Sequence, residues 1–354
     1  MKVLFINETD IFRNNSSGIT IRDLFGEQYC SNSYILGIYD GEFHFQKGKT
    51  LIWKKKFKYI TFINVLLKMR KIDFDIAYTT GSSVKMLVFL SMLRIITKKP
   101  ILVHYFDNWR EIGKKRIKNI LLSVIEKNNS TSLVISEEMK KHYSLTYGGK
   151  YEVLMVGTMN SDTVSTVFKD GKKTLMYAGG LHLGREKALL EIENTIKKNG
   201  LQMSIELYTF ESDYKKYANL FDNSITKIHV DILHNDIIAK YKEADALLFV
   251  EMGYGSDINF LQYSMSTKVP EYLSIGVPIV CYAREDIAVT QYFLRNNAAL
   301  VATRKEQLLD TLITLDNKEY VLSIVSNAVV ASNRDFNRTR QRKILFETMN
   351  RIIN

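Results

Sequence analysis

The sequence predicts an α/β protein built from two parallel β-sheets, and three observations support this fold class. Short runs rich in β-branched and aromatic residues recur along the chain, with helical stretches between most of them. These runs form two series, which a polar stretch in the middle of the chain separates. The chain has 354 residues, enough for two domains that each bury a core. Alternating strands and helices imply parallel sheets that helices cover on both faces.

The first series contains the strands expected in the first half of the chain. They are Val3–Asn7, Tyr34–Ile38, Ile76–Thr79, Ile101–His104, Leu133–Ser136 and Glu152–Met155. Between residues 157 and 172, Ser, Thr, Asp and Gly then replace the apolar pattern, which predicts a link between domains. We therefore expect the first domain to span residues 1–160.

The second series contains the strands expected in the second half. They are Thr174–Ala178, Ser204–Thr209, Lys227–Val230, Ala246–Val250, Pro278–Tyr282 and Ala299–Ala302. This series predicts a second domain over residues 161–334. The remaining residues, 335–354, are basic and amphipathic, and we expect them to form a final helix.

Composition indicates a protein of the reducing cytoplasm. The two cysteines, Cys30 and Cys281, lie far apart in apolar contexts, which favours buried thiols over a disulfide. The first residues match a strand rather than a secretion signal, because their apolar run is too short. No stretch reaches the roughly 18 apolar residues of a membrane span. Clustered His and Cys patterns are also absent from the sequence, so we expect no protein-bound metal.

The positive charge of the protein is concentrated in its first half. The net charge is +11, and residues 1–160 carry 25 basic against 14 acidic side chains. The densest part is Lys47–Lys71, with nine basic and no acidic residues among bulky apolar ones. As a helix, this stretch would suit an anionic membrane surface, or it would pack on the core with a solvated lysine face. Nucleic acid is not expected as a partner, since no nucleic-acid-binding motif is visible.

One stretch, QYSMSTKVPEYLSIGVPIVCYA from Gln262 to Ala283, combines several features of an anion site. Ser266, Thr267 and Lys268 precede or begin a short helix, whose unpaired N–H groups and dipole favour negative charge. Lys268 and Glu271 are three residues apart and share a helix face, so Glu271 could bind the two hydroxyls of a ribose. The alternative is a buried helix that Ser266 or Thr267 caps, with Glu271 completing a capping box.

The part STKVPEYLSIGVPIV resembles the donor-binding segment of glycosyltransferases with the GT-B fold, above all the retaining family 4. The resemblance implies two Rossmann-like domains with parallel sheets facing a central cleft, and a final helix that packs back on the first domain. It also implies that Glu271 binds the donor ribose, as the second glutamate of an E-x7-E pair. The first glutamate of that pair would fall at Tyr263, so the pair is incomplete in this chain.

A second diphosphate motif is expected in LMYAGGLHLGREKALLEI, at the start of the second domain. Glycines such as Gly180 let the backbone approach a phosphate, and Arg185 and Lys187 can offset charge on a leaving group. The family resemblance implies an arginine and a lysine that clamp the donor phosphates. The alternative is a pair of exposed cations at a helix start, which the helix dipole disfavours.

Two further candidates follow strands of the first domain, where a parallel sheet presents groups to a ligand. Gly18 lies in the loop ETDIFRNNSSGI, which resembles the family's glycine loop and would admit a donor phosphate. His104 ends the fourth expected strand, near Asp107, and a histidine there can transfer protons near neutral pH. A structural role for His104 is the alternative.

Together these motifs predict a metal-independent, retaining glycosyltransferase of the hexosyltransferase type. The donor would be a nucleotide-sugar, with a UDP-sugar favoured over a GDP-sugar, and no further cofactor is expected. The acceptor would be a saccharide or lipid-linked saccharide in capsule, exopolysaccharide or O-antigen assembly, at the inner face of a bacterial membrane. Two rivals stay open: a non-catalytic scaffold subunit of the same fold, and a nucleotide-sugar epimerase.

Overall fold

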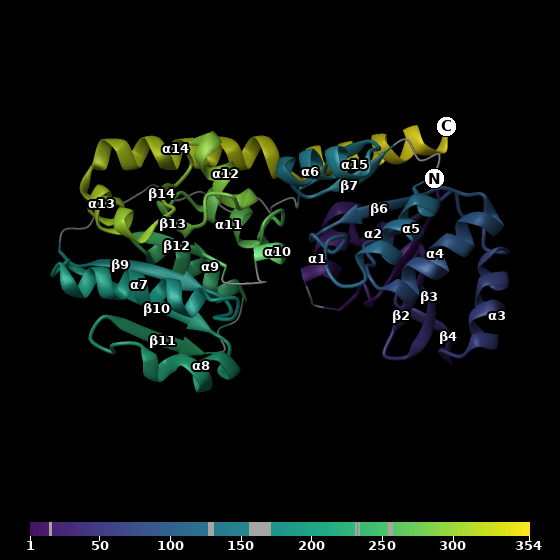
Figure 1. Cartoon of the computed structure of the whole chain (residues 1–354), viewed down its shortest axis with the longest axis horizontal. Coiled ribbons are helices and arrows are strands. Elements are labelled where there is room, and N and C mark those ends of the chain that lie inside the picture. The colour runs from purple at the N-terminus through teal and green to yellow at the C-terminus, as the bar shows by residue number, and fades with distance from the viewer. Residues whose placement is uncertain (14–15, 127–130, 156–170, 231, 233, 254–257) are drawn as a thin grey trace. The chain divides into compact units, whose positions relative to one another are not determined.

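The computed structural model describes residues 1–13, 16–126, 131–155, 171–230, 232, 234–253 and 258–354. It divides the chain into two compact units (Figure 1). The first unit comprises Met1–Gly157, Tyr263–Met265 and Arg338–Asn354, and the second comprises Thr158–Gln262 and Ser266–Asn337. Most of the expected link at residues 157–172 lies outside the described residues, which resume at residue 171. The short segment Tyr263–Met265, which the sequence did not set apart, belongs to the first unit.

The first unit contains an eight-stranded sheet with the order β4-β3-β2-β1-β5-β6-β7-β8. Its strands are β1 (Val3–Asn7), β2 (Tyr34–Tyr39), β3 (Glu42–Lys47), β4 (Thr50–Lys56), β5 (Ile76–Thr79), β6 (Ile101–Tyr105), β7 (Ser132–Val134) and β8 (Tyr151–Val153). The run from β2 to β8 is parallel, and β3 and β4 add an antiparallel edge. The order of the strands reverses at β1, which pairs with both β2 and β5.

The helices of the first unit cover this sheet and include the end of the chain. They are α1 (Ser16–Phe25), α2 (Glu27–Asn32), α3 (Tyr59–Met69), α4 (Val84–Thr97), α5 (Lys115–Ile125), α6 (Glu137–Tyr147) and α15 (Arg338–Ile353). Helix α15 packs on α1 and buries Leu345 and Met349 in the core. Arg338 donates to Asp23 of α1 at 3.0 Å, so a polar contact also fixes this helix.

The basic stretch Lys47–Lys71 is not one helix, and that expectation was wrong. Its first half is strand β4, an exposed edge strand, and only its second half is a helix, α3. The turn between β3 and β4 explains the difference, because Gly48 has a positive φ there and lets β4 fold back to pair antiparallel with β3. Lysines are frequent on edge strands such as β4 because they discourage aggregation.

The second unit contains a six-stranded, fully parallel sheet with the order β11-β10-β9-β12-β13-β14. Its strands are β9 (Lys173–Ala178), β10 (Met203–Thr209), β11 (Thr226–Val230), β12 (Ala246–Glu251), β13 (Ile279–Ala283) and β14 (Leu300–Ala302). The chain builds outward from β9 to β11 and then returns to place β12 on the other side of β9. The carboxyl ends of β9 and β12 therefore flank a topological switch point, where α/β sheets bind ligands.

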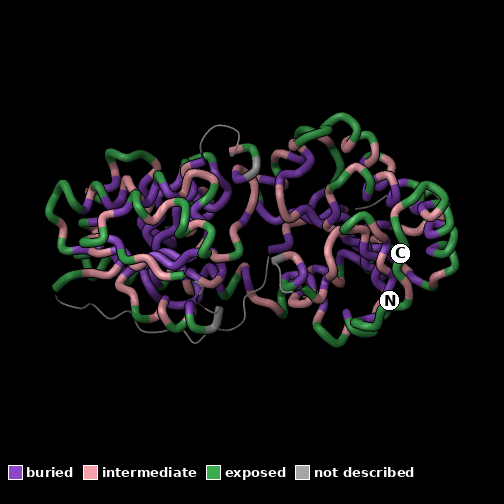
Figure 2. Tube along the Cα trace, turned by 90° about the horizontal axis from the view of Figure 1, so that it is seen from below, coloured by how far each residue is buried: buried purple, intermediate pink, exposed green. Residues whose placement is uncertain are grey.

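Helices cover both faces of this second sheet, whose strands are mostly buried (Figure 2). They are α7 (Arg185–Lys198), α8 (Glu211–Tyr217), α9 (His234–Glu243), α10 (Ile258–Leu261), α11 (Lys268–Ile275), α12 (Ala288–Asn296), α13 (Leu308–Ile313) and α14 (Lys318–Asp335), with short 3-10 turns at Ala218–Leu220, Lys305–Gln307 and Thr314–Asp316. All the strands expected from the sequence are present, with ends that shift by two residues at most. Among the described residues, no helix is both long and apolar enough to cross a membrane.

Candidate functional site

The second unit gathers charged side chains at its topological switch point. Strand β9 ends at Ala178 and leads through Gly179 to helix α7, which begins at Arg185. Strand β12, its neighbour in the sheet, ends at Glu251. The side chains of Arg185 and Glu251 meet in an ion pair of 2.6 Å. Both are largely buried, with 13% and 6% of their side chains exposed, so the pair is held tightly at the strand ends.

Lys268, the first residue of α11, completes this group. Its ammonium lies 4.5 Å from the ring centre of Tyr177 and 3.4 Å from the Tyr177 hydroxyl. Burial first, and then the nearby Arg185, lower the pKa of Lys268 to about 7, although Glu251 and Glu271 act in the opposite direction. The two carboxylates therefore offset only part of what burial and Arg185 cost the charged form of Lys268.

Gly179 is required at this point for a steric reason. A side chain on Gly179 would overlap the end of the Lys268 side chain, and the residue has a φ of +143°, which side chains rarely adopt. The absence of a Cβ thus makes room for the ammonium beside the strand end. Gly180, which follows, accepts a hydrogen bond from the Tyr177 hydroxyl at 2.7 Å through its carbonyl.

The start of α11 has part of the cap that the alternative interpretation expected, at Ser266 rather than at Thr267. Thr267 occupies the N-cap position, and its side chain makes no capping hydrogen bond. The Ser266 hydroxyl instead accepts from the Lys268 amide at 3.4 Å. Glu271 lies in the first turn of α11, is half-buried, and acts electrostatically on Lys268. Lys268, Glu271 and the Arg185–Glu251 pair thus form one charged cluster, which we call the strand-end cluster.

Lys187 and Gly18, which the resemblance assigns to the donor phosphates, lie on α7 and α1. Lys187 is exposed on α7, and residues two apart on a helix point about 200° apart, so its side chain leaves α7 opposite Arg185. Gly18 is buried inside the first turn of α1 rather than in a loop that precedes the helix. The structure therefore brings Arg185 together with Lys268, and a role of Lys187 or Gly18 in binding phosphate stays a prediction.

His104 was wrongly expected to face a ligand. It lies inside strand β6 with 1% of its surface exposed. Its Nε2 is 3.2 Å from the Leu154 carbonyl, which only accepts, so Nε2 carries the proton and Nδ1 accepts from the Tyr78 hydroxyl at 2.8 Å. Burial lowers the pKa of His104 to about 3. A neutral histidine with both nitrogens bonded in the core has a structural role.

Tyr263, at the position of the missing glutamate, packs within the first unit. Its ring stacks on His142 with centroids 4.5 Å apart, and its carbonyl accepts from the Ser136 hydroxyl at 2.6 Å. The next residue, Ser264, donates to Asp107 at 3.1 Å. Ser136 also caps α6 by accepting from the Met139 amide at 3.1 Å, as its place in the sequence predicted. Tyr263 therefore anchors the segment that leads to α11.

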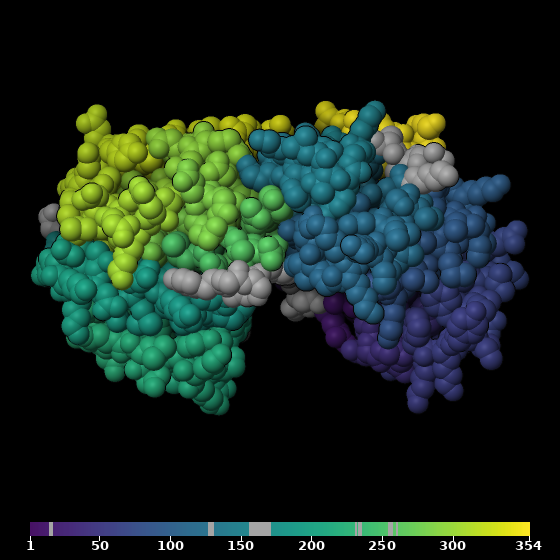
Figure 3. Space-filling model, in the orientation of Figure 1, coloured from purple at the N-terminus to yellow at the C-terminus, as the bar shows by residue number. Residues whose placement is uncertain are grey.

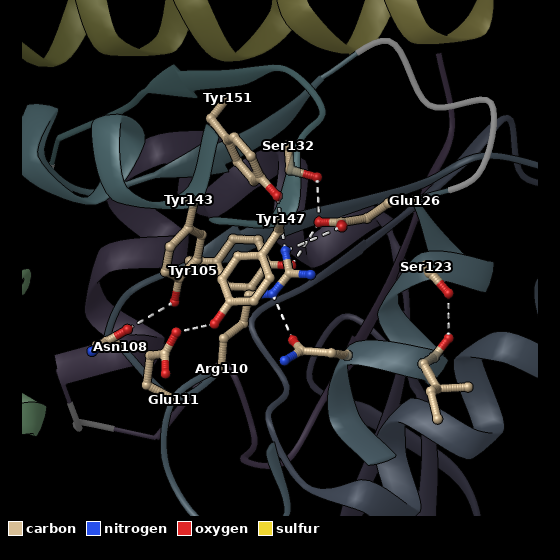
Figure 4. Close-up of polar contacts among 12 residues, drawn as sticks. Tyr105, Asn108, Arg110, Glu111, Ser123, Glu126, Ser132, Tyr143, Tyr147 and Tyr151 are labelled. Atoms are coloured by element: carbon tan, nitrogen blue, oxygen red, sulfur yellow. Dashed lines mark hydrogen bonds and ion pairs between the residues drawn. The ribbon is translucent and has the colours of Figure 1, made fainter. Parts of the chain in front are cut away.

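A buried arginine, which no sequence motif indicated, fixes the loop that follows β6. The Arg110 guanidinium donates to Tyr151 at 2.8 Å, to Glu126 at 3.3 Å and to Asn119 at 3.0 Å (Figure 4). It also lies 3.8 Å from the ring centre of Tyr147. These contacts connect the loop to α5, α6 and β8, and they hold the loop in place at the carboxyl edge of the first sheet.

Comparisons with known proteins identify the fold of the chain. No protein-family model and no curated protein matches the sequence. Among solved structures, Anabaena HepE in complex with UDP-glucose aligns with a TM-score of 0.70 at 13% identity, over 99% of this chain and 100% of that one. A glycosyltransferase from Rickettsia africae aligns with a TM-score of 0.74 at 12% identity, over 100% and 99%. The apo structure of OtsA aligns with a TM-score of 0.67 at 8% identity, over 99% of both chains. The chain has the GT-B fold, as the resemblance implied.

We predict that Gly179→Ala lowers the free energy of unfolding by about 1–3 kcal/mol, because the methyl group must displace the Lys268 side chain and strain the backbone. Gly200→Ala is the matched control, since Gly200 also has a positive φ but faces open space. Urea unfolding of both variants measures the difference. Equal losses in the two variants would mean that the Lys268 side chain moves aside freely.

Proposed function

We propose that this GT-B protein is a glycosyltransferase that binds the diphosphate of a nucleotide-sugar donor at the strand-end cluster of its second unit. The observation that carries the proposal is the pairing of Arg185 and Lys268 at a topological switch point, with Glu251 as the closest carboxylate. Two cations at strand ends suit a group with more than one negative charge. Gly179 leaves the backbone there without a side chain.

The same cluster can stabilise the reaction that such a donor undergoes. When the bond from the sugar to the diphosphate breaks, negative charge increases on the phosphate oxygens. Arg185 and Lys268 would offset this charge, and fixed cations of this kind lower the barrier because they need no rearrangement. The Glu271 carboxylate can accept hydrogen bonds from the two hydroxyls of the ribose. Retention of the anomeric configuration and transfer of a hexose belong to the proposal through the family resemblance.

Electrostatics favour this function over the scaffold alternative. A half-buried lysine next to an arginine costs folding free energy, since both burial and repulsion disfavour its charged form. A bound anionic donor would offset this cost, whereas in a scaffold that never binds an anion nothing would offset it. The donor is proposed to be a UDP-sugar, because the HepE structures contain UDP and UDP-glucose. The acceptor is proposed to be a saccharide or lipid-linked saccharide of surface polysaccharide assembly.

We expect one nucleotide among UDP, GDP, ADP and CMP to raise the melting temperature, because a ligand that binds only the folded state stabilises it. The rise should be the same with EDTA and should be lost in Lys268→Ala and Glu271→Ala. Lys198→Ala, at the far end of α7 and exposed, serves as a matched control that keeps it. Hydrolysis or transfer of the matching nucleotide-sugar should fall by 10²-fold or more in Lys268→Ala.

A protein that no nucleotide stabilises would instead fit the scaffold alternative. A protein that converts the nucleotide-sugar into its epimer, without releasing the nucleotide, would fit the epimerase alternative. Product analysis by mass spectrometry and NMR separates these outcomes from transfer.

The affinity for UDP should depend on pH through Lys268. Its pKa of about 7 lies below the ordinary value, so above pH 7 the free protein must take up a proton before the cation can bind the diphosphate. The dissociation constant should therefore rise by up to about tenfold per pH unit from pH 7 to 9. Calorimetric titrations of wild type and Lys268→Arg test this, because arginine stays charged throughout. Ionisation of UDP affects both proteins equally, so parallel profiles would contradict a titrating Lys268.

We also propose that β4 and α3 hold the first unit peripherally on an anionic membrane at the inner face of the cell. Tyr59 and Ile60, which begin α3, have 81% and 74% of their surfaces exposed. The Lys47–Lys71 stretch that contains them lies on the surface of the first unit (Figure 3), and its Lys55, Lys56 and Lys58 are exposed. Exposed apolar side chains close in sequence to exposed lysines match the chemistry of an interface between acidic headgroups and acyl chains.

Replacing Lys55, Lys56 and Lys58 by Gln should weaken binding to phosphatidylglycerol vesicles by roughly 10²-fold, since each lysine near such a surface contributes about 1 kcal/mol. Lys54 is left in place because it pairs with Glu42 at 2.6 Å. Co-sedimentation measures the binding, and the same three changes at Lys140, Lys141 and Lys150 provide a control of equal net charge. Equal binding of both triple variants would show that β4 and α3 are only a solvated face.

A further inference from the structure

A buried tyrosine supports the strand-end cluster from within the core of the second unit. Tyr177 is the last residue but one of β9, and only 1% of its surface is exposed. The Lys268 ammonium lies over the face of its ring, 4.5 Å from the ring centre, and 3.4 Å from its hydroxyl oxygen. The same hydroxyl donates to the Gly180 carbonyl at 2.7 Å. One side chain therefore contacts both a cation of the cluster and the loop that follows β9.

The direction of the two hydroxyl contacts follows from the protons available. A tyrosine hydroxyl has one proton to donate, and the Gly180 carbonyl can only accept, so the proton lies toward Gly180. The lone pairs of the hydroxyl oxygen are then left for the Lys268 ammonium, which can only donate. Burial raises the pKa of Tyr177, so the hydroxyl keeps its proton while Lys268 titrates. Both the oxygen and the ring face therefore favour the charged form of Lys268.

The loop after β9 is held at three consecutive residues. The Gly179 amide donates to a carbonyl of β10 at 2.9 Å, and the Leu181 amide donates to the Asp213 carboxylate of α8 at 2.8 Å. The Gly180 carbonyl, between these two amides, accepts from Tyr177. Because the amides of Gly179 and Leu181 already donate within the protein, a diphosphate at this edge relies on the side chains of the cluster more than on these amides. The orientation of those side chains then matters for binding.

We propose that Tyr177 is a positioning residue of this site: its hydroxyl joins the loop after β9 to the Lys268 ammonium and holds that ammonium where it meets a diphosphate. The inference rests on the proposed function for the identity of the ligand. The hydroxyl, rather than the ring, carries this role, because the ring packs in the core whatever binds. The charged and titratable groups that act on Lys268 or interact with Tyr177 are Arg185 of α7, Asp213 of α8, Tyr241 of α9, Glu251 of β12, and Glu271 and Tyr272 of α11.

Tyr177→Phe tests the hydroxyl, since it keeps the ring and removes the oxygen. In the protein without ligand, the pKa of Lys268 should fall by about half a pH unit, because the ammonium loses an acceptor. Carbon-13 NMR titration of lysine labelled at Cε measures this pKa, and the resonance that is missing from Lys268→Arg belongs to Lys268. UDP should bind about three- to tenfold more weakly at pH 8, since less of Lys268 is charged and its ammonium is less firmly held.

Tyr292→Phe is the matched control. Tyr292 is also buried in the second unit, on α12, and its hydroxyl donates to Asp335 of α14 at 2.8 Å. This variant loses a buried hydrogen bond as well, so it should lower the melting temperature. It should leave both the pKa of Lys268 and the affinity for UDP unchanged, because its hydroxyl has no part in the cluster.

A measurement on the wild type keeps the test decisive if Tyr177→Phe does not fold. With tyrosine labelled at Cζ, one resonance should titrate together with Lys268, and this titration should be lost in Lys268→Arg. The absence of such a resonance would overturn the proposal.

An unchanged pKa of Lys268 in Tyr177→Phe would also overturn the proposal, and so would an unchanged affinity in a protein that binds UDP. Equal changes in the two tyrosine variants would contradict it as well, because they would indicate a structural role only. A wild type that binds no nucleotide would contradict the proposed function instead. The NMR titrations need no nucleotide, so they would still show whether the hydroxyl positions Lys268.

Discussion

The strand-end cluster of the second unit is built around the repulsion between two cations, Arg185 and Lys268, which the second sheet brings together. Arg185 and Lys268 begin different helices, and the sheet order brings both to the ends of β9 and β12. Glu251 and the ring of Tyr177 offset part of their charge, and Gly179 makes the space that Lys268 fills. Burial first, and then the charge of Arg185, lower the pKa of Lys268, so both disfavour its charged form. A diphosphate would relieve the repulsion, which connects the cost in the folded protein to a proposed function.

The sheet of each unit has a topological switch point, and the side chains at the two switch points differ in the sign of their charge. The second unit places cations and glycine there, whereas the first places Glu8, which bonds to the start of α4. The two sheets therefore share a principle of construction but suit different ligand chemistry. The fold provides the position of a site, and a few side chains at strand ends decide what binds.

Much of this architecture could be predicted from the sequence, because strands of a parallel sheet are short apolar runs and Lys268 and Glu271 share one helical turn. Other features depend on contacts between distant residues. Glu251 ends a buried strand, and only the order of the sheet places it beside Arg185. His104 was misjudged because its hydrogen-bond partners, Tyr78 and Leu154, lie far from it in the sequence, and β4 was taken for a helix because its lysines and bulky apolar residues were weighed above the turn at Gly48.

The most direct test of the central claim is a crystal structure of the protein with UDP. We expect the diphosphate to contact the side chains of Arg185 and Lys268 beyond Gly179, and the Glu271 carboxylate to bind the ribose hydroxyls. UDP bound away from the ends of β9 and β12, with the Arg185–Glu251 pair and Lys268 unchanged, would contradict the account.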